Sequence, residues 1–473
     1  MTHVIANLQN KINANSESGL GLLDNFARNL KVFDWSNSTT WQILNQGFAN
    51  NDDALDVLRR VQLDTLTGSA EGERLNGSIA DERLMGFGGD DILNGAAGND
   101  LLEAGDGNDI LEAGAGNDTL SGGSGNDVLD GNAGSDCYIF QHGFGNDHIH
   151  QYDTAVDSVD VAIFSDLSPQ NIVKTTRQGD DLSLLFSTSD QLTIDGYFDV
   201  AARRVDFFQF FNGEKWDLAT VKVHVDTLGT LEDDTLYGYT GGDNRLFGLD
   251  ANDELHGNTG NDFVNGGEGN DTLYGQSGDD TLDGGMGVDI LKGGNGNDLY
   301  YVNSINDSIV ETTNAGLDTV LSSVNYMLPV NIENLTLATS AGNSNATGNV
   351  LDNLLVGNEG NNVLSGGRGN DTLQGSQGND IYLFGKGDGQ DSIIDNSNVG
   401  EINVLQFKSD VTPTKVTVSH LGNDLILSII GTTDKITVNS SFNNELNTVC
   451  PSVKQVLFSD GTSWNLWMGL GMA

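Results

Sequence analysis

The sequence predicts an all-β protein in which blocks of a parallel β-solenoid alternate with small β-rich modules, preceded by a short helical segment. An apolar residue recurs every nine residues, for example at Leu84, Leu93 and Leu102, with an acidic residue two positions before it. Glycine is abundant, with 62 residues, whereas proline is rare, with 4. A short fixed period is typical of solenoids, in which each repeat is one structural unit.

The composition favours cations as partners and disfavours nucleic acid and anionic membranes. Lys and Arg together number 21 and Asp and Glu 68, so the formal net charge is −47. A surface of this sign repels polyanions. High net charge is also typical of disordered chains. Because 37% of the residues are apolar and recur at fixed spacing, we instead expect order that depends on conditions.

The nine-residue repeat occurs in three blocks, each of which ends in an aromatic-rich strand (CYIF, LYYV and IYLF). A block followed by a segment of about 90 residues occurs twice, about 245 residues apart. These segments alternate apolar and polar residues, which predicts short half-buried strands. We divide the chain into a segment with a helical face at Leu55, Leu58 and Val61 (1–63), a first roll (64–140), a first β-rich module (141–228), a second roll (229–302), a strand-rich connector (303–346), a third roll (347–384) and a second β-rich module (385–473).

One repeat, GGSGNDVLD from Gly122 to Asp130, shows what the spacing does. Glycine allows backbone dihedrals that other residues avoid, so the first six positions are expected to form a tight turn with carbonyl groups aimed inward. The last three positions form a strand whose single apolar side chain points to the interior. Two strands complete a coil of 18 residues, and stacked coils bury leucine against leucine across a flattened roll.

Stacking brings residues 18 apart together, because parallel strands lie about 4.8 Å apart. Asp91, Asp109 and Asp127 are therefore expected in a row along one edge. Two carboxylates about 5 Å apart repel by about 1 kcal/mol in water and about 3 kcal/mol at an effective dielectric constant of 20. Ca²⁺ between the turns reverses this repulsion, since it accepts several oxygen ligands in a forgiving geometry. Mg²⁺ demands a stricter octahedron, and Zn²⁺ prefers the Cys or His that these turns lack.

The nonapeptide resembles the glycine- and aspartate-rich repeat of RTX, or haemolysin-type calcium-binding, proteins. The resemblance covers about 180 residues and implies a parallel β-roll with several Ca²⁺ ions as cofactors. Glu73, Glu82, Asn353, Asn362 and the stretch YGYTGGDNRLF depart from the pattern and weaken metal binding at the outer coils, where capping is expected. Carried over position by position, the ligands that the family implies are Asp91, Asp100, Asp109, Asp118, Asp127, Asp136, Asp253, Asp262, Asp271, Asp280, Asp289, Asp298, Asp371 and Asp380, with Gly and Asn carbonyls of the same turns.

The paired segments around Trp216 and Trp464 resemble the haemolysin-type calcium-binding-related module found beside such rolls. The family further implies type I secretion and an extracellular location, including the bacterial cell surface. The N-terminus lacks a Sec-type signal and no run has the length of a membrane-spanning helix, which agrees with that route. We expect a protein that folds on Ca²⁺ outside the cell and serves as an adhesin, surface or matrix component, with a cell-surface or polysaccharide ligand.

Two other classes of function remain open. An RTX toxin or bacteriocin-like protein would carry an apolar membrane-active segment, and none is visible. In the second class, the chain is a non-catalytic or accessory part of a secreted polysaccharide-acting enzyme. The chain itself is expected not to be an enzyme, because neither His-Glu-x-x-His nor Gly-x-Ser-x-Gly occurs.

Two smaller features have two interpretations each. His148 and His150 stand two apart on one expected strand with His142 nearby, which suits either a transition metal or a plain exposed strand. The aromatic run from Phe207 to Trp216 suits a module core or a sugar-stacking platform, and we favour the core. Cys137, next to Tyr138 on its expected strand, is expected to be a small buried residue.

Overall fold

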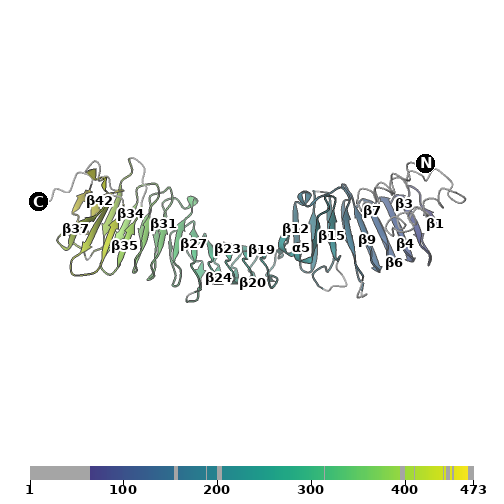
Figure 1. Ribbon diagram of the computed structural model, residues 1–473, viewed down its shortest axis with the longest axis horizontal. Coiled ribbons are helices and arrows are strands. Elements are labelled where there is room, and N and C mark those ends of the chain that lie inside the picture. The colour runs from purple at the N-terminus through teal and green to yellow at the C-terminus, as the bar shows by residue number, and fades with distance from the viewer. Residues whose placement is uncertain are drawn as a thin grey trace. The chain divides into compact units, whose positions relative to one another are not determined.

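The computed structural model describes residues 64–153, 158–187, 189–199, 205–313, 315–394, 400–409, 411–439, 442–443, 448–449 and 452–466. The helical face expected at Leu55, Leu58 and Val61 lies outside these residues. The chain divides into two compact units, Met1–Val221 and Lys222–Ala473. Each unit is a stack of parallel β-coils (Figure 1). The α-helix of the described residues, α5 (Leu218–His224), contains the boundary between the units.

The first unit begins as a roll of two facing parallel sheets. One sheet contains β1 (Asp64–Thr67), β3 (Glu82–Gly88), β5 (Leu101–Asp106), β7 (Thr119–Ser124) and β9 (Cys137–Phe140). The facing sheet contains β2 (Arg74–Asn76), β4 (Ile92–Ala97), β6 (Ile110–Ala115), β8 (Val128–Ala133) and β10 (Asn146–Ile149). Leu84 pairs with Leu102, and Leu93 with Leu111, so neighbours are one 18-residue coil apart. These leucines have no exposed surface, so the predicted leucine core is confirmed.

The strands extend further than the nine-residue pattern suggests. Strand β8 spans six residues and includes the glycine that opens the next repeat. Gly105 pairs with Gly123 where β5 and β7 lie side by side in the sheet, so the second glycine also belongs to the sheet. The expected six-residue turn is therefore wrong, and the turn is confined to the next three positions. Gly123 adopts φ +113, and a Cβ there would overlap the carbonyl oxygen of Gly105, so glycine lets the two coils approach closely at this point.

The first β-rich module continues the sheets of the roll. Strand β11 (Val161–Phe164) pairs in parallel with β9, β15 (Phe207–Phe210) pairs in parallel with β11, and β16 (Lys215–Asp217) closes this sheet in antiparallel orientation. The facing sheet ends in β14 (Gln191–Ile194), which is parallel to β10, and in β13 (Asp181–Leu185) and β12 (Lys174–Gln178), which are antiparallel. A 3₁₀ turn, η2 (Pro169–Asn171), precedes β12.

Two side-chain expectations meet the structure in this module. Phe208, Phe210 and Trp216 are buried, which agrees with a packed core, whereas Phe211 is 71% exposed. Cys137 is only half-buried, so the expectation of a buried thiol is wrong. The physical reason is the alternation of a strand: Tyr138 and Phe140 point into the core, and Cys137 between the turn and Tyr138 points outward.

The second unit repeats this plan over more coils. One sheet contains β17 (Asp226–Leu228), β19 (Arg245–Asp250), β21 (Phe263–Glu268), β23 (Thr281–Met286), β25 (Leu299–Val302), β27 (Thr319–Ser322), β29 (Asn334–Leu337), β31 (Leu354–Val356), β33 (Thr372–Gln374) and β35 (Gln390–Ile393). The opposite side has β18 (Thr235–Tyr237), β20 (Glu254–Thr259), β22 (Thr272–Ser277), β24 (Ile290–Asn295) and β26 (Ser308–Ile309), followed by β28 (Tyr326–Met327), β30 (Ala346–Thr347), β32 (Val363–Ser365), β34 (Ile381–Phe384) and β36 (Asn403–Phe407). Within the described ranges, β26 and β28 are not hydrogen-bonded to each other, so this side consists of two sheets.

The C-terminal end of the second unit mirrors that of the first. Strand β35 pairs with β39 (Lys435–Val438), which is followed by antiparallel β38 (Asp424–Ile429) and β37 (Val416–Leu421). Strand β36 pairs with β42 (Val453–Leu457), which carries antiparallel β43 (Ser463–Asn465). Shorter elements are η4 (Thr339–Ala341), η5 (Pro413–Lys415), β40 (Phe442–Asn443) and β41 (Thr448–Val449).

A single buried core runs through the second unit from Leu246 to Leu466. The connector at 303–346 contributes β26 to β30 to the same stack, so it continues the solenoid between two rolls. The segment boundaries drawn from the sequence stay predictions. Across the part of the chain that is described, no helix is both long enough and apolar enough to cross a membrane.

Candidate metal sites in the glycine turns

All fourteen aspartates predicted from the repeat lie buried at the coil edges, each with at most 3% of its surface exposed. Backbone-to-carboxylate hydrogen bonds connect them in rows. The rows are Asp91, Asp109 and Asp127; Asp100, Asp118 and Asp136; Asp253, Asp271 and Asp289; and Asp262, Asp280 and Asp298, with Asp371 and Asp380 opening two shorter rows. We call each row a ladder. The structure therefore brings these residues together as the spacing predicted.

One carboxylate oxygen of each aspartate is used by the preceding coil. The Oδ1 atom of Asp109 accepts a hydrogen bond from the backbone N–H of Asp91, with an N–O distance of 2.7 Å. In the second unit, Oδ1 of Asp280 accepts from the N–H of Asp262 at 2.8 Å. Hydrogen bonds to a charged acceptor are stronger than neutral ones. This contact holds the side chain in one orientation and leaves the second oxygen directed into its own turn.

The second oxygen, Oδ2, has no hydrogen-bond partner in any of the fourteen aspartates, although it is buried. Leaving a buried polar group without a partner costs about 1–3 kcal/mol, and more if the group is charged. Repetition of the same orphaned atom in turn after turn shows a property of the repeat. A cation site needs acceptor oxygens that no hydrogen-bond donor occupies, and these turns provide them.

The glycine that opens each repeat leaves space beside this oxygen. A Cβ built on Gly95 would lie 2.5 Å from Oδ2 of Asp100 and 2.6 Å from the carbonyl oxygen of Ala113 in the next coil. The same two kinds of oxygen surround the equivalent glycines of the second unit, such as Gly248. A carboxylate and a backbone carbonyl thus face a common space that any side chain would fill. This all-oxygen donor set fits Ca²⁺.

Burial also makes the ladders electrostatically unfavourable at neutral pH. The pKa of Asp118 and of Asp136 is raised to about 7, chiefly by desolvation and also by the neighbouring carboxylate in each ladder, while the backbone N–H opposes the shift. The pKa of Asp280 is raised to about 8 for the same reasons. A bound cation would offset both causes, because it replaces the lost hydration and separates the like charges.

Three further aspartates have the same geometry but were missed by the nine-residue count. Asp147, Asp318 and Asp391 are buried, and each has an orphaned Oδ2. Their Oδ1 atoms accept the N–H of the aspartate 20 residues earlier, at 2.9–3.1 Å. Two extra residues in the intervening coil shift them out of register. The triplet Gly-x-Asp, present before each of them, is the signal that could have found them.

The histidines do not form a comparable site. Nδ1 of His148 and of His150 lie 3.5 and 2.5 Å from the carboxylate of Asp195, and both rings are about half exposed. His142 instead lies 3.1 Å from Asp190. Among the residues with described positions, no three His, Cys, Asp or Glu side chains are arranged to hold a metal ion. The ladders differ from such clusters because backbone carbonyls supply part of their donor set.

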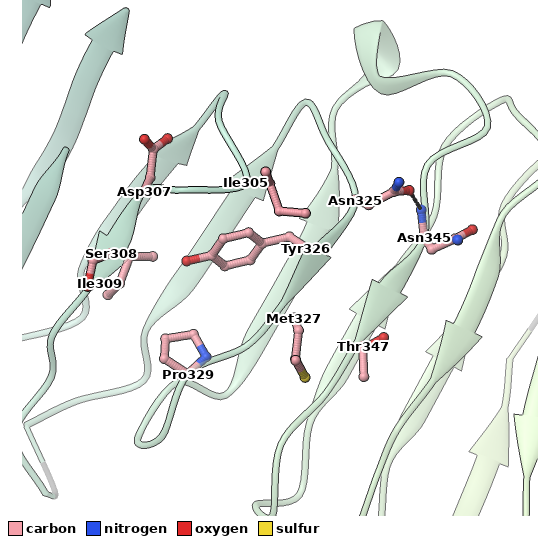
Figure 2. Close-up of a pocket in the computed structure, with 10 residues that line it drawn as sticks. All are labelled: Ile305, Asp307, Ser308, Ile309, Asn325, Tyr326, Met327, Pro329, Asn345 and Thr347. Atoms are coloured by element: carbon pink, nitrogen blue, oxygen red, sulfur yellow. Dashed lines mark hydrogen bonds between the residues drawn. The ribbon is translucent and has the colours of Figure 1, made fainter. Parts of the chain in front are cut away.

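A groove of about 500 Å³ opens on the second unit where β26 and β28 are unpaired. Figure 2 shows the ring of Tyr326 extending from β28 toward Ser308 and Ile309 on β26. Its other lining residues include the apolar Met327 and the polar Asn345. The groove therefore mixes apolar and hydrogen-bonding groups, and it contains none of the orphaned carboxylates.

Parallel coils around a leucine core, with a buried carboxylate in each glycine turn, define a β-roll of the calcium-binding type. Residues 67–102, 103–136, 238–273, 265–300 and 347–391 match the family model of the RTX calcium-binding nonapeptide repeat. Residues 183–220 and 424–466 match the haemolysin-type calcium binding protein related domain. The chain therefore carries RTX calcium-binding repeats and two modules of the related domain, and both the repeats and the paired modules predicted from the sequence are confirmed.

Similarity to individual proteins is more limited. The iron-regulated protein FrpA of Neisseria meningitidis serogroup C is 35% identical over 116 residues, which are 24% of this chain and 10% of that relative. The chain thus matches about a tenth of the length of this relative. The solved structure of the extracellular lipase LipA from Serratia marcescens aligns with 79% of this chain and 39% of that chain, at 12% identity and a TM-score of 0.15.

Proposed function

We propose that this protein acts outside the cell, where Ca²⁺ binding to the aspartate ladders folds the rolls. The folded rolls serve a binding or structural role, as an adhesin, surface or matrix component. The observation that carries the proposal is the buried, orphaned Oδ2 atom repeated in the fourteen predicted aspartates and in Asp147, Asp318 and Asp391. The ligand role of these residues belongs to the proposal.

Ca²⁺ held by these oxygens would supply the positive charge that the ladders lack. The residues of the chain do the rest of the work. Each aspartate uses Oδ1 to hold the N–H of the preceding coil and presents Oδ2 to its turn. The glycines keep that space free of side chains and let the carbonyl groups approach. Stacking of such coils makes folding cooperative along each roll.

Export before folding follows from the expected affinity. Extracellular calcium modules bind with dissociation constants of about 10⁻⁴ to 10⁻³ M. Turns of that affinity stay empty in the cytosol, so the chain passes a type I secretion system largely unfolded and gains its folding free energy from the metal outside. The presence of RTX repeats supports this route.

The partner of the folded protein is proposed to be a cell-surface or polysaccharide ligand, and the chain itself is proposed to lack catalytic activity. The groove between β26 and β28 supports a ligand of this kind, since Asn345, Ser308 and Thr347 offer hydrogen bonds beside apolar side chains. Binding of the calcium-loaded and calcium-free protein to cells and polysaccharides would test this role. Membrane leakage from liposomes would favour a toxin instead, and cleaved or epimerised glycan products would favour an enzyme.

A calcium titration followed by circular dichroism and native mass spectrometry tests the core of the proposal. We expect coil in EDTA, strand in millimolar Ca²⁺, and a fixed number of bound ions. Asp109→Asn should lower the ion count, because the amide keeps the Oδ1 contact but loses the charge. Asp90→Asn is the matched control, since Asp90 is exposed and its Oδ1 accepts hydrogen bonds from the backbone N–H and the Nδ2 group of Asn108. A strand spectrum that EDTA leaves unchanged contradicts the proposal.

A further inference from the structure

The turn at the start of every ladder differs from the turns above it. Six residues occupy the aspartate position one coil before the first orphaned aspartate, and each donates its backbone N–H to Oδ1 of that aspartate. They are Glu73, Glu82, Asp234, Asn244, Asn353 and Asn362. None of the six has an orphaned side-chain oxygen. We call them the base residues.

Each base residue has a side-chain oxygen that accepts a hydrogen bond within its own turn. Oε2 of Glu73 accepts the N–H of Ser69 at 2.9 Å, and the Ser69 hydroxyl donates to Oε1. Oδ2 of Asp234 accepts the N–H of Thr230 at 2.5 Å and its hydroxyl at 2.9 Å. An acidic residue at this position is therefore not enough for a metal turn. A Ser or Thr four residues earlier supplies hydrogen-bond donors that take the place of a cation.

The three asparagine bases go further, because the amide nitrogen takes up carbonyl oxygens. Nδ2 of Asn244 lies 3.0 Å from the carbonyl oxygen of Gly257 in the next coil and 2.8 Å from Oδ1 of Asp262. The carbonyl oxygen of Gly242 is also 2.8 Å away. Gly257 holds the position equivalent to Ala113, whose carbonyl faces an orphaned Oδ2 in the aspartate turns. An amide N–H₂ group thus lies among the oxygens that face the metal space in the turns above.

The two asparagine bases of the third roll satisfy their amides differently, with Nδ2 directed to the preceding coil. Oδ1 of Asn353 accepts the N–H of Asn349 at 2.7 Å, while its Nδ2 donates to the carbonyl groups of Ile332 and Glu333 at 3.1 and 3.0 Å. Nδ2 of Asn362 similarly donates to two carbonyl oxygens of the preceding coil. A neutral amide provides both an acceptor and donors, so it closes the turn without adding charge.

We propose that the six base turns take no calcium and form metal-free platforms on which the ladders begin. The inference rests on the proposed function and deepens it, since it states which turns are loaded and which are not. Each platform offers its backbone N–H to the first metal-binding aspartate whether or not calcium is present. The platforms therefore set the N-terminal limit of each ladder and the maximum number of ions in each roll.

The test compares charge removal at the bases with charge removal one coil above. The variant Glu73→Gln/Glu82→Gln/Asp234→Asn keeps an acceptor oxygen at each base and should bind as many Ca²⁺ ions as the parent in native mass spectrometry. The comparison variant Asp91→Asn/Asp100→Asn/Asp253→Asn removes the same number of charges from the same ladders and should lose ions. Loss of one or more ions from the base variant overturns the inference.

A second variant tests the amide directly. Asn244→Ala removes the group that holds the base turn of the second roll, whereas Asn265→Ala changes a half-buried asparagine on β21 that lies outside the turns. We expect the Ca²⁺ concentration at the midpoint of folding to rise about twofold or more for Asn244→Ala, with an unchanged ion count. An unchanged midpoint, or a changed ion count, overturns the platform. If the parent protein binds no calcium, the proposed function itself fails. If the parent binds calcium but a base variant departs from these expectations, only the inference about the base turns fails.

Discussion

The first roll and the module that ends it stabilise the same two sheets by different means. A roll coil has one fully buried leucine per strand, such as Leu102 and Leu111, and carries an aspartate with an orphaned oxygen in each turn. The module packs a cluster of aromatic rings instead, in which Phe164 lies 4.7 Å from Phe186 and 5.1 Å from Phe210 between ring centroids. The roll buries carboxylate oxygens that no donor satisfies, whereas the module has an apolar core of aromatic rings.

One ladder shows where the change occurs. Asp136 is the last aspartate of its ladder with an orphaned oxygen. The next residue in that ladder, Asp160, uses both oxygens: Oδ1 accepts the N–H of Asp136, and Oδ2 accepts Nε2 of Gln151, both at 2.8 Å. A satisfied carboxylate therefore separates the coils with orphaned oxygens from the aromatic core. The comparison teaches that stacking alone does not leave an oxygen orphaned, since the partners of the second oxygen decide it.

Calcium removal should separate the two regions most strongly. In EDTA we expect the roll strands between Leu84 and Ala133 to lose their protection from hydrogen exchange completely, because the carboxylates repel and nothing bridges them. The strands around Phe164 and Phe208 should retain part of theirs. Hydrogen exchange with mass spectrometry of the full chain measures both. Equal loss in both regions would show that the module has no stability of its own.

Removal of an aromatic ring from the module should have the next largest effect. Phe164→Ala is expected to lower the free energy of unfolding by about 3–5 kcal/mol, because it leaves a cavity in the ring cluster. The number of bound Ca²⁺ ions should stay constant. Phe211→Ala serves as control, since Phe211 is 71% exposed. Denaturant unfolding in calcium measures the difference, and a lost ion would contradict the separation of roles.

Two glycines with positive φ compare the regions at the level of the backbone. Gly116→Ala should destabilise the roll by more than the about 1–2 kcal/mol of left-handed strain, because the new Cβ also meets the carbonyl group of Gly98. Gly213→Ala in the module pays only the strain, since nothing lies within 4 Å of its Cβ position. Thermal unfolding of both variants in calcium checks the order. Equal effects would show that the close approach of Gly116 to the carbonyl group of Gly98 adds nothing to the cost of the substitution.

Acidification should act on the metal-free roll in a smaller and opposite way to calcium removal. The pKa of Asp118 and Asp136 is raised to about 7 in the folded roll, against about 3.9 in an unfolded chain. The folded form therefore binds more protons between about pH 4 and 7, and its stability falls as the pH rises through about 7. In EDTA, we expect strand content to increase from pH 8 to pH 5. Maximal metal-free strand content at pH 8 would contradict this sign.

Much of the fold and of the site follows from the repeat itself. The positions of Leu93 and Asp100 are determined by a local rule, in which a strand alternates and a coil closes after two repeats. The count failed at Asp147, Asp318 and Asp391 because a coil tolerates two extra residues while the hydrogen bonds restore the register. It also placed the C-terminal ends of the strands too early, since the residues that open the next repeat continue the sheet.

The sequence by itself determined the solenoid, its leucine core and the rows of carboxylates, because a short period is a local property that each repeat carries. Only the tertiary structure decided which carboxyl groups keep an unsatisfied oxygen. Glu73 and Asp91 occupy equivalent positions, yet Ser69 satisfies the oxygen of Glu73 that is left open in Asp91. The physical reason is that satisfaction of a buried acceptor depends on donors contributed by other residues of the turn and by adjacent coils, which a count along the chain does not contain.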